Sequence, residues 1–212
     1  MIIENKEIKD ISILPLILAN LAPIFGVLFF RWDIFSVIFL YWQESAIIGF
    51  YNILKMYKAN GTKAADITIN DIIANKLSKV FIIVFFMFHY GMFMLVHGMF
   101  IFVIFARQKP IFSYKFFMDN YYFAILLLFI SHGISYYVNF IGKEEYKKIS
   151  VSEQMQKPYS RIIAMHLTIL LSAFLVMAFG KQTIISLFIL IAIKIAMDLR
   201  AHIKEHKQFT NI

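Results

Sequence analysis

Residues 80–105 form an uninterrupted apolar run, and no other feature of the chain constrains its fold as strongly. The run reads VFIIVFFMFHYGMFMLVHGMFIFVIF and contains no Lys, Arg, Asp or Glu. About 20 apolar residues in a helix are enough to cross the hydrocarbon core of a bilayer. We therefore expect a transmembrane helix here, around which the rest of the chain is organised. Its two histidines, His89 and His97, should lie near one face, about 12 Å apart along the helix axis.

The composition of the 212 residues indicates a polytopic membrane protein, because 60% of them are hydrophobic, against about 45–50% in soluble domains. The formal net charge is +8. Most Lys and Arg residues fall in polar segments between the apolar runs, where they set topology and meet anionic lipid. We therefore expect the lipid bilayer as a partner, and no nucleic acid. The chain has no cysteine, so histidines and carboxylates are its only strong metal ligands.

The hydropathy pattern predicts a single integral membrane domain, residues 1–212, folded as an all-α bundle of transmembrane helices. Six spans are expected, at about 12–30, 34–57, 79–105, 119–141, 162–180 and 182–199. Of the 21 Lys and Arg residues, 16 lie on the side that holds both termini and five lie on the other. By the positive-inside rule, we expect a multi-pass protein of the cell membrane with both termini cytoplasmic.

Two polar connections, residues 58–78 and 142–161, lie on the predicted cytoplasmic side. Thr68 precedes Asp71 by three residues, and Ser150 precedes Glu153 by three. This spacing is typical of helix starts. We therefore expect a short interfacial helix in each connection.

Three spans place an ionisable side chain at a similar predicted depth. At about 1.5 Å per residue, Glu44 lies roughly 16 Å, His89 roughly 15 Å and His132 roughly 12 Å from the cytoplasmic boundary. An isolated carboxylate in hydrocarbon is costly. Glu44 should therefore be protonated, hydrogen-bonded to a histidine, or bound to a cation.

A second, shallower tier is expected closer to the cytoplasmic boundary. His166 lies roughly 6 Å from it, and Asp198 and His202 have the i, i+4 spacing that lets two side chains reach one ion. The alternatives are a solvated helix end and an ion pair between Asp198 and Lys194. His97 is predicted near the outer boundary instead. For His97 and His166, the alternative role is a hydrogen bond to a neighbouring helix.

Imidazole and carboxylate ligands without thiolate suit zinc, iron or manganese, and a helix bundle can collect them from several helices. One hypothesis is therefore a membrane enzyme in which a divalent metal activates water and Glu44 acts as general base. Its substrate would be a membrane-accessible small molecule. No haem is expected. The candidate metal ligands are four histidines and one aspartate: His89, His132, His166, Asp198 and His202.

Two other hypotheses use the same polar groups without catalysis. In a small transporter or channel, they would pass protons or a cation through the bilayer. In a structural subunit, they would only lock the helices together. The chain contains no HExxH, GxSxG or Walker sequence, so no common catalytic motif decides between these hypotheses. A homo-oligomer is compatible with each of them.

Five segments together resemble an uncharacterised family of prokaryotic integral membrane proteins, a domain of unknown function. The segments cover most of the chain: LYWQESAIIGFYNILKM, FHYGMFMLVHGMF, SHGISYYVNFIGKEEY, PYSRIIAMHLTILLSAF and LIAIKIAMDLRAH. The resemblance implies a six-helix membrane protein and assigns no activity. The family signatures fall on nine residues: Trp42, Glu44, His89, His97, His132, Pro158, Tyr159, Arg161 and His166.

Overall fold

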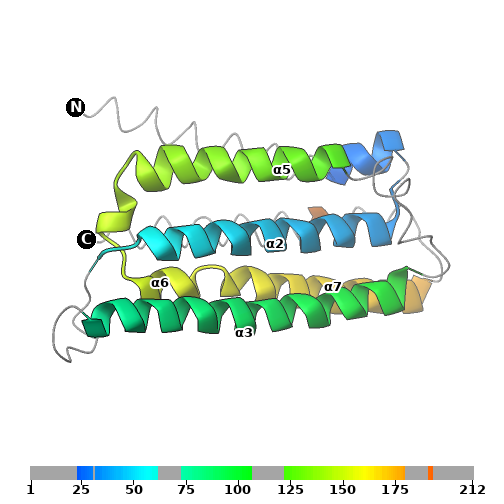
Figure 1. The fold of residues 1–212 in the computed structure, drawn as a ribbon. Helices are drawn as coiled ribbons and strands as arrows, with labels where there is room; N and C mark the ends of the chain where they lie inside the picture. Colours follow the sequence, from blue (N-terminus) through cyan, green and yellow to red (C-terminus); the bar gives the residue numbers. More distant parts are fainter. Residues whose placement is uncertain (1–22, 31, 62–72, 107–121, 180–190, 193–212) are drawn as a thin grey trace.

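The computed structural model of the protein describes residues 23–30, 32–61, 73–106, 122–179 and 191–192 (Figure 1). Every regular element within these ranges is helical, which confirms the all-α prediction. The elements within these ranges are α2 (Ile34–Lys58), α3 (Ile73–Phe105), α5 (Tyr122–Ser135), η1 (Tyr136–Ile141), η2 (Glu145–Lys147), α6 (Val151–Gln156) and α7 (Tyr159–Phe179).

Four helical segments are long and apolar enough to cross a membrane, which supports a location in a membrane. They are Ile34–Lys58, Ser78–Phe105, Tyr122–Ile141 and Val151–Met177. These segments correspond to the second to fifth predicted spans. The first predicted span is described only over residues 23–30, which are helical, and the sixth only over residues 191–192. The remaining parts of both spans lie outside the described residues.

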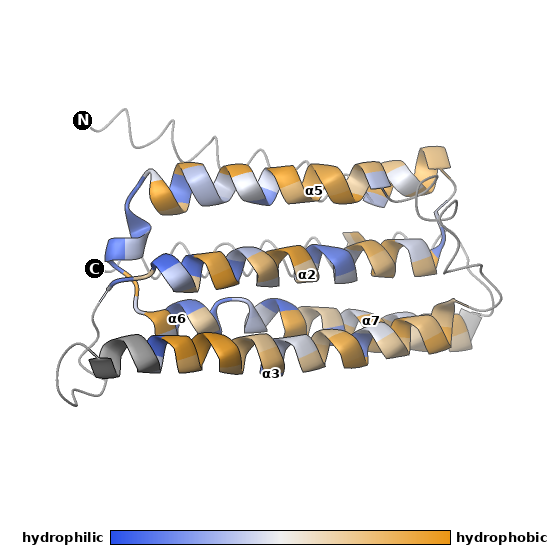
Figure 2. Ribbon diagram, in the orientation of Figure 1, coloured by the Kyte–Doolittle hydropathy of each residue, from blue (hydrophilic) through white to orange (hydrophobic). Residues whose placement is uncertain are grey.

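The four segments alternate in direction along the bundle (Figure 1). The end of α2, the start of α3, the end of η1 and the start of α6 lie at one end of the bundle, which is the predicted cytoplasmic end. Figure 2 shows apolar residues along most of these helices and hydrophilic turns within α2. Of the consecutive spans, α2 and α3 are antiparallel neighbours, whereas α5 lies on the other side of α2 from α3 (Figure 1).

The central helix is α2, which packs against α3, α5, α6 and α7. Within its most apolar stretch 72% of the residues are buried, against 22% for α3. The expectation that the chain is organised around residues 80–105 is therefore wrong for the described residues. The apolar run forms a helix on the outside of the bundle, and the less apolar α2 forms its centre.

Local sequence signals explain where these helices begin. The Asp33 carboxylate accepts a hydrogen bond from the backbone N–H of Ser36 and caps α2. The Ser150 hydroxyl and the Glu153 carboxylate form a reciprocal capping box at the start of α6. This confirms the helix predicted in residues 142–161, although α6 packs against α2 and α3 within the bundle. The helix predicted in residues 58–78 falls largely outside the described residues.

Candidate functional site

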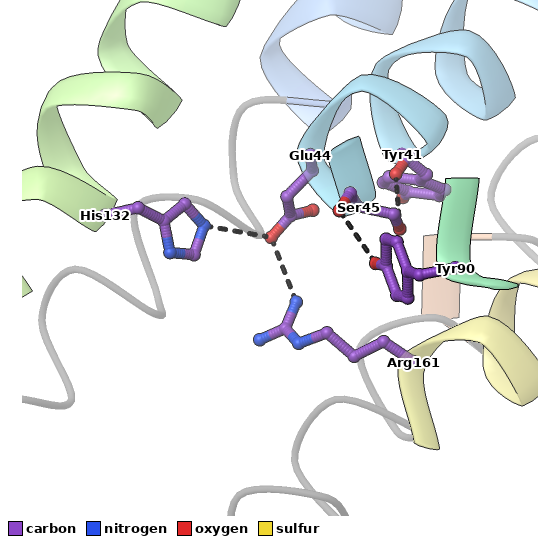
Figure 3. Close-up of polar contacts among 6 residues, drawn as sticks. All are labelled: Tyr41, Glu44, Ser45, Tyr90, His132 and Arg161. Carbon is purple, nitrogen blue, oxygen red and sulfur yellow. Dashed lines mark hydrogen bonds and ion pairs between the residues drawn. The ribbon is translucent and has the colours of Figure 1, made fainter. Parts of the chain in front are cut away.

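The Glu44 carboxylate of α2 is the meeting point of three helices (Figure 3). Its side chain is only 7% exposed. Its Oε1 atom lies 3.3 Å from Nη1 of Arg161 on α7 and 3.9 Å from Nε2 of His132 on α5. The guanidinium donates a hydrogen bond at this distance, whereas 3.9 Å is an ion-pair distance that is too long for a hydrogen bond. Two side chains that can carry positive charge thus approach one carboxylate oxygen.

The position of His132 follows from the packing of α5 against α2. The Tyr51 hydroxyl of α2 donates a hydrogen bond to the Phe129 carbonyl of α5 at 3.0 Å. Gly133 lies against the same hydroxyl, since an added Cβ would lie 2.7 Å from it. The glycine therefore permits the close approach that brings the neighbouring His132 to Glu44. A few residues later α5 continues as the π-helical η1, a form often found as a short irregularity near functional sites.

The position of Arg161 follows from the start of α7. Pro158 stands between α6 and α7, where the missing N–H of proline leaves no hydrogen bond unmade. Its carbonyl accepts from the backbone N–H of Arg161 in the first turn of α7. The sequence analysis counted Arg161 among the residues of the cytoplasmic connection, although the family signature included it. The capping box at Ser150 was the available signal that the helical segment begins well before residue 162.

The neighbouring contacts fix α3 against α2 beside Glu44. The Tyr90 hydroxyl of α3 donates a hydrogen bond to the Ser45 carbonyl at 2.8 Å, and the Ser45 hydroxyl donates to the Tyr41 carbonyl (Figure 3). An added Cβ on Gly49 would lie 2.5 Å from the Tyr90 ring. The glycine therefore lets Tyr90 lie flat against α2. These bonds hold the backbone next to Glu44 in place.

His89 lies near this level but bonds elsewhere. Its Nδ1 is 2.8 Å from the Tyr159 hydroxyl of α7, and its ring stacks on Phe85 at a centroid distance of 5.1 Å. The structure therefore joins Glu44 to His132 and joins His89 to Tyr159. That His89 and His132 bind one ion stays a prediction.

Within the described ranges, no three His, Asp or Glu side chains lie close enough together to hold a metal ion. Asp198 and His202, the candidate ligands of the last predicted span, lie outside those ranges. The metal site therefore stays a prediction.

His97 and His166 bond to each other across α3 and α7. The distance from His97 Nε2 to His166 Nδ1 is 3.1 Å. The hydrogen bond to a neighbouring helix that was predicted for these two histidines is therefore present, and the role of His166 as a metal ligand stays a prediction. The bond also shows that their predicted depths, one near each boundary, cannot both be right, since the two rings are in contact. His166 lies deeper than predicted because the span that carries it begins at Val151.

Comparison with known proteins gives one match. The family described as "Family of unknown function (DUF6498)" matches residues 3–211, nearly the whole chain. No curated protein and no solved structure matches the chain. The match confirms the resemblance to a domain of unknown function.

Proposed function

Because the chain belongs to this family of unknown function, we propose its function from the geometry of the site alone. The protein passes protons across the bilayer, and His132 exchanges them beside the ion pair of Glu44 and Arg161. The observation that carries this proposal is that Arg161 and His132, from two different helices, share Oε1 of one buried carboxylate.

The two cationic partners compete on nearly equal terms. At an effective dielectric constant of about 20, unit charges attract by about 5 kcal/mol at 3.3 Å and by about 4 kcal/mol at 3.9 Å. A protonated His132 thus attracts Glu44 almost as strongly as Arg161 does. Arginine keeps its charge at all physiological pH values, whereas free histidine titrates between about pH 5 and 8. The exchangeable proton therefore belongs on His132.

Proton uptake at His132 changes which helix Glu44 holds. The neutral imidazole leaves the carboxylate to Arg161, so α2 is tied to α7. The imidazolium draws Glu44 towards α5 and weakens the tie to α7. A proton thus shifts the balance between two arrangements of helices that pack on the same central α2. Such a shift is what a proton pathway needs to open on one side at a time.

The other two hypotheses fit this geometry less well. A structural lock needs one cation for Glu44, and a second, titratable partner on α5 would make the strength of that lock depend on pH. A divalent metal at the same oxygen would be repelled by the guanidinium of Arg161, 3.3 Å away. A metal-dependent enzyme therefore needs ligands other than Glu44, and the predicted ones remain His89, His132, His166, Asp198 and His202.

The finer topology is part of the proposal. The excess of Lys and Arg on one side supports six spans in one domain, with both termini cytoplasmic. In that orientation, His132 exchanges protons with the cytoplasmic half of the bundle.

Proton flux into liposomes tests the proposed function. The purified protein is reconstituted with an internal pH-sensitive dye, and a potassium diffusion potential drives proton entry. We expect faster acidification than in protein-free liposomes, and at least a tenfold slower rate for His132→Gln and Glu44→Gln, on the order expected when a proton-transfer group is removed. Ser172→Ala is the control, because the Ser172 hydroxyl donates a hydrogen bond to the Thr168 carbonyl of its own helix, away from Glu44 and His132 in the chain. Flux equal to that of protein-free liposomes would refute the proposal, as would full flux in both variants.

A further inference from the structure

The sequence contains two His–Gly pairs, His97–Gly98 and His132–Gly133, and the central helix α2 contacts both in the same way. On α5, the Tyr51 hydroxyl of α2 donates a hydrogen bond at 3.0 Å to the Phe129 carbonyl, four residues before the glycine. A Cβ on Gly133 would lie 2.7 Å from that hydroxyl, so the glycine leaves the room that the tyrosine occupies.

The pair on α3 repeats this arrangement. The Trp42 indole N–H of α2 donates a hydrogen bond at 2.7 Å to the Met94 carbonyl, again four residues before the glycine. A Cβ on Gly98 would lie 2.8 Å from the Trp42 ring. Two aromatic donors of α2 thus contact two other helices at the same position relative to a histidine.

Such a contact fixes the histidine that precedes the glycine. In a helix, the carbonyl of residue i bonds to the N–H of residue i+4, and its second lone pair can accept from a side chain. The aromatic donor therefore holds one helical turn at both ends, by its bond to the carbonyl and by its ring on the glycine. The histidine at i+3 lies within that turn, so the helix cannot slide or rotate there without breaking a contact.

A third contact of this kind carries no histidine. The Tyr90 hydroxyl of α3 donates to the Ser45 carbonyl of α2, and Gly49 lies against the tyrosine ring. Residue i+3 of this turn is Ile48. The arrangement by itself therefore packs helices together, and the contacts of Tyr51 and Trp42 differ from it in the residue that they hold.

We propose that Tyr51 and Trp42 are positioning residues, each of which sets the place of one imidazole through the backbone of a neighbouring helix. Tyr51 holds His132 with its Nε2 atom 3.9 Å from Oε1 of Glu44. The Tyr51 ring also lies beside the imidazole, with ring centroids 6.5 Å apart. Trp42 holds His97 against α7. That this positioning serves proton passage rests on the proposed function, whereas the positioning itself does not.

Solid-state NMR of the reconstituted protein measures the position of His132. Carbon-13 glutamate and nitrogen-15 histidine labels give a dipolar coupling between the Glu44 carboxylate and His132, which Glu44→Gln identifies. We expect this coupling to fall to about half in Tyr51→Phe, which corresponds to a misplacement of about 1 Å and is enough to impair a positioned group. The matched control is Tyr57→Phe, because the Tyr57 side chain of the same helix is 72% exposed. This control should leave the coupling unchanged.

Trp42→Phe tests the contact on α3 in the same way. His97 Nε2 lies 3.1 Å from His166 Nδ1, so nitrogen-15 labels should show a scalar coupling across this hydrogen bond. We expect Trp42→Phe, which removes the indole donor, to weaken that coupling, and Tyr57→Phe to leave it unchanged. An unchanged coupling in Trp42→Phe would overturn the role of Trp42.

Gly133→Ala separates the positioning role of Tyr51 from its packing. The added Cβ would lie 2.7 Å from the Tyr51 hydroxyl and 3.4 Å from the nearest ring carbon, so this change alone should make the protein less resistant to denaturant. Tyr51→Phe in the same chain removes the clash and should restore the resistance. The donor is still absent, so the coupling between Glu44 and His132 and the proton flux should stay low in the stable double variant.

Recovery of this coupling or of the flux together with the stability would overturn the role of Tyr51, as would a wild-type coupling in Tyr51→Phe alone. Wild-type protein that passes no protons would instead refute the proposed function. The couplings would then still decide whether Tyr51 and Trp42 position the two histidines.

Discussion

Removal of the Arg161 guanidinium should lower the free energy of unfolding, because the buried Glu44 carboxylate then loses a compensating charge. Loss of one partner of a buried ion pair typically costs about 3–5 kcal/mol, because the other charge is left uncompensated. Arg161 is 28% exposed and His132 remains beside Glu44, so we expect the lower end, about 3 kcal/mol, for Arg161→Gln. Glu44→Gln removes the charge itself and should cost about 1 kcal/mol or less, since a neutral amide is easier to bury.

The double variant decides whether the two side chains act as a pair. Once Glu44 is neutral, Arg161→Gln leaves no charge behind, so the double variant should be about 2 kcal/mol more stable than the sum of the single changes indicates. The free energy of unfolding is measured by denaturant titration in bicelles at neutral pH. Additivity within about 0.5 kcal/mol would refute the reasoning.

A matched exposed pair gives the control for this cycle. Lys147 donates a hydrogen bond to Glu144 at 2.5 Å, with both side chains more than half exposed. This bond raises the pKa of the Lys147 amine. Exposed ion pairs contribute little to stability, so the same cycle at Lys147 and Glu144 should be close to additive.

Three further predictions use other parts of the chain. Gly98→Ala should destabilise the protein by about 1–3 kcal/mol in the same unfolding assay, because the added Cβ would lie 2.8 Å from the Trp42 ring. Gly91→Ala on the same helix is the control. Its added Cβ meets nothing within 4 Å, so this change should be neutral or stabilising. Reporter fusions after residues 61 and 212 should report cytoplasm, and one after residue 109 should report the outside; an external signal at 212 would contradict the topology. Elemental analysis of detergent-purified protein should find stoichiometric zinc, iron or manganese if the predicted ligands bind a metal, and metal-free protein would contradict that prediction.

The sequence predicted the presence of helices better than their arrangement. Length and apolarity are enough to identify a candidate spanning segment, and at four of the predicted spans the structure has a helix long and apolar enough to cross a membrane. Their order of burial was not predicted. Of the four, α2 is the least apolar and α3 the most apolar, yet α2 is the most buried. In a bilayer, the surface that faces lipid must be apolar, whereas the interior tolerates polar groups that bond to each other. The least apolar span was therefore the better signal for the centre.

The candidate site was predicted in part. The similar depth of Glu44 and His132 was predicted from the fixed rise of a helix, and the two side chains do meet. Arg161 was missed because hydropathy places it outside its span, and a long side chain on the first turn can still reach a neighbouring helix. The contact between His97 and His166 was also missed because the start of the span that carries His166 was misplaced. An error in the start of a span shifts the predicted depth of every residue along it. Hydropathy locates the apolar centre of a span more reliably than its ends.

The burial of α2 also limits how the proposed proton exchange can work. A helix packed against four others cannot move without breaking contacts on several sides, so α2 is the fixed element and its partners are the ones that shift. Glu44 faces α5 and α7, from which His132 and Arg161 reach its carboxylate. Gain or loss of one proton at His132 therefore acts on a contact that two outer helices share with a fixed centre. At this contact, the attractions of Glu44 to Arg161 and to protonated His132 are nearly equal, at about 4–5 kcal/mol. A charge change of one unit at His132 can therefore decide which of the two helices the carboxylate holds.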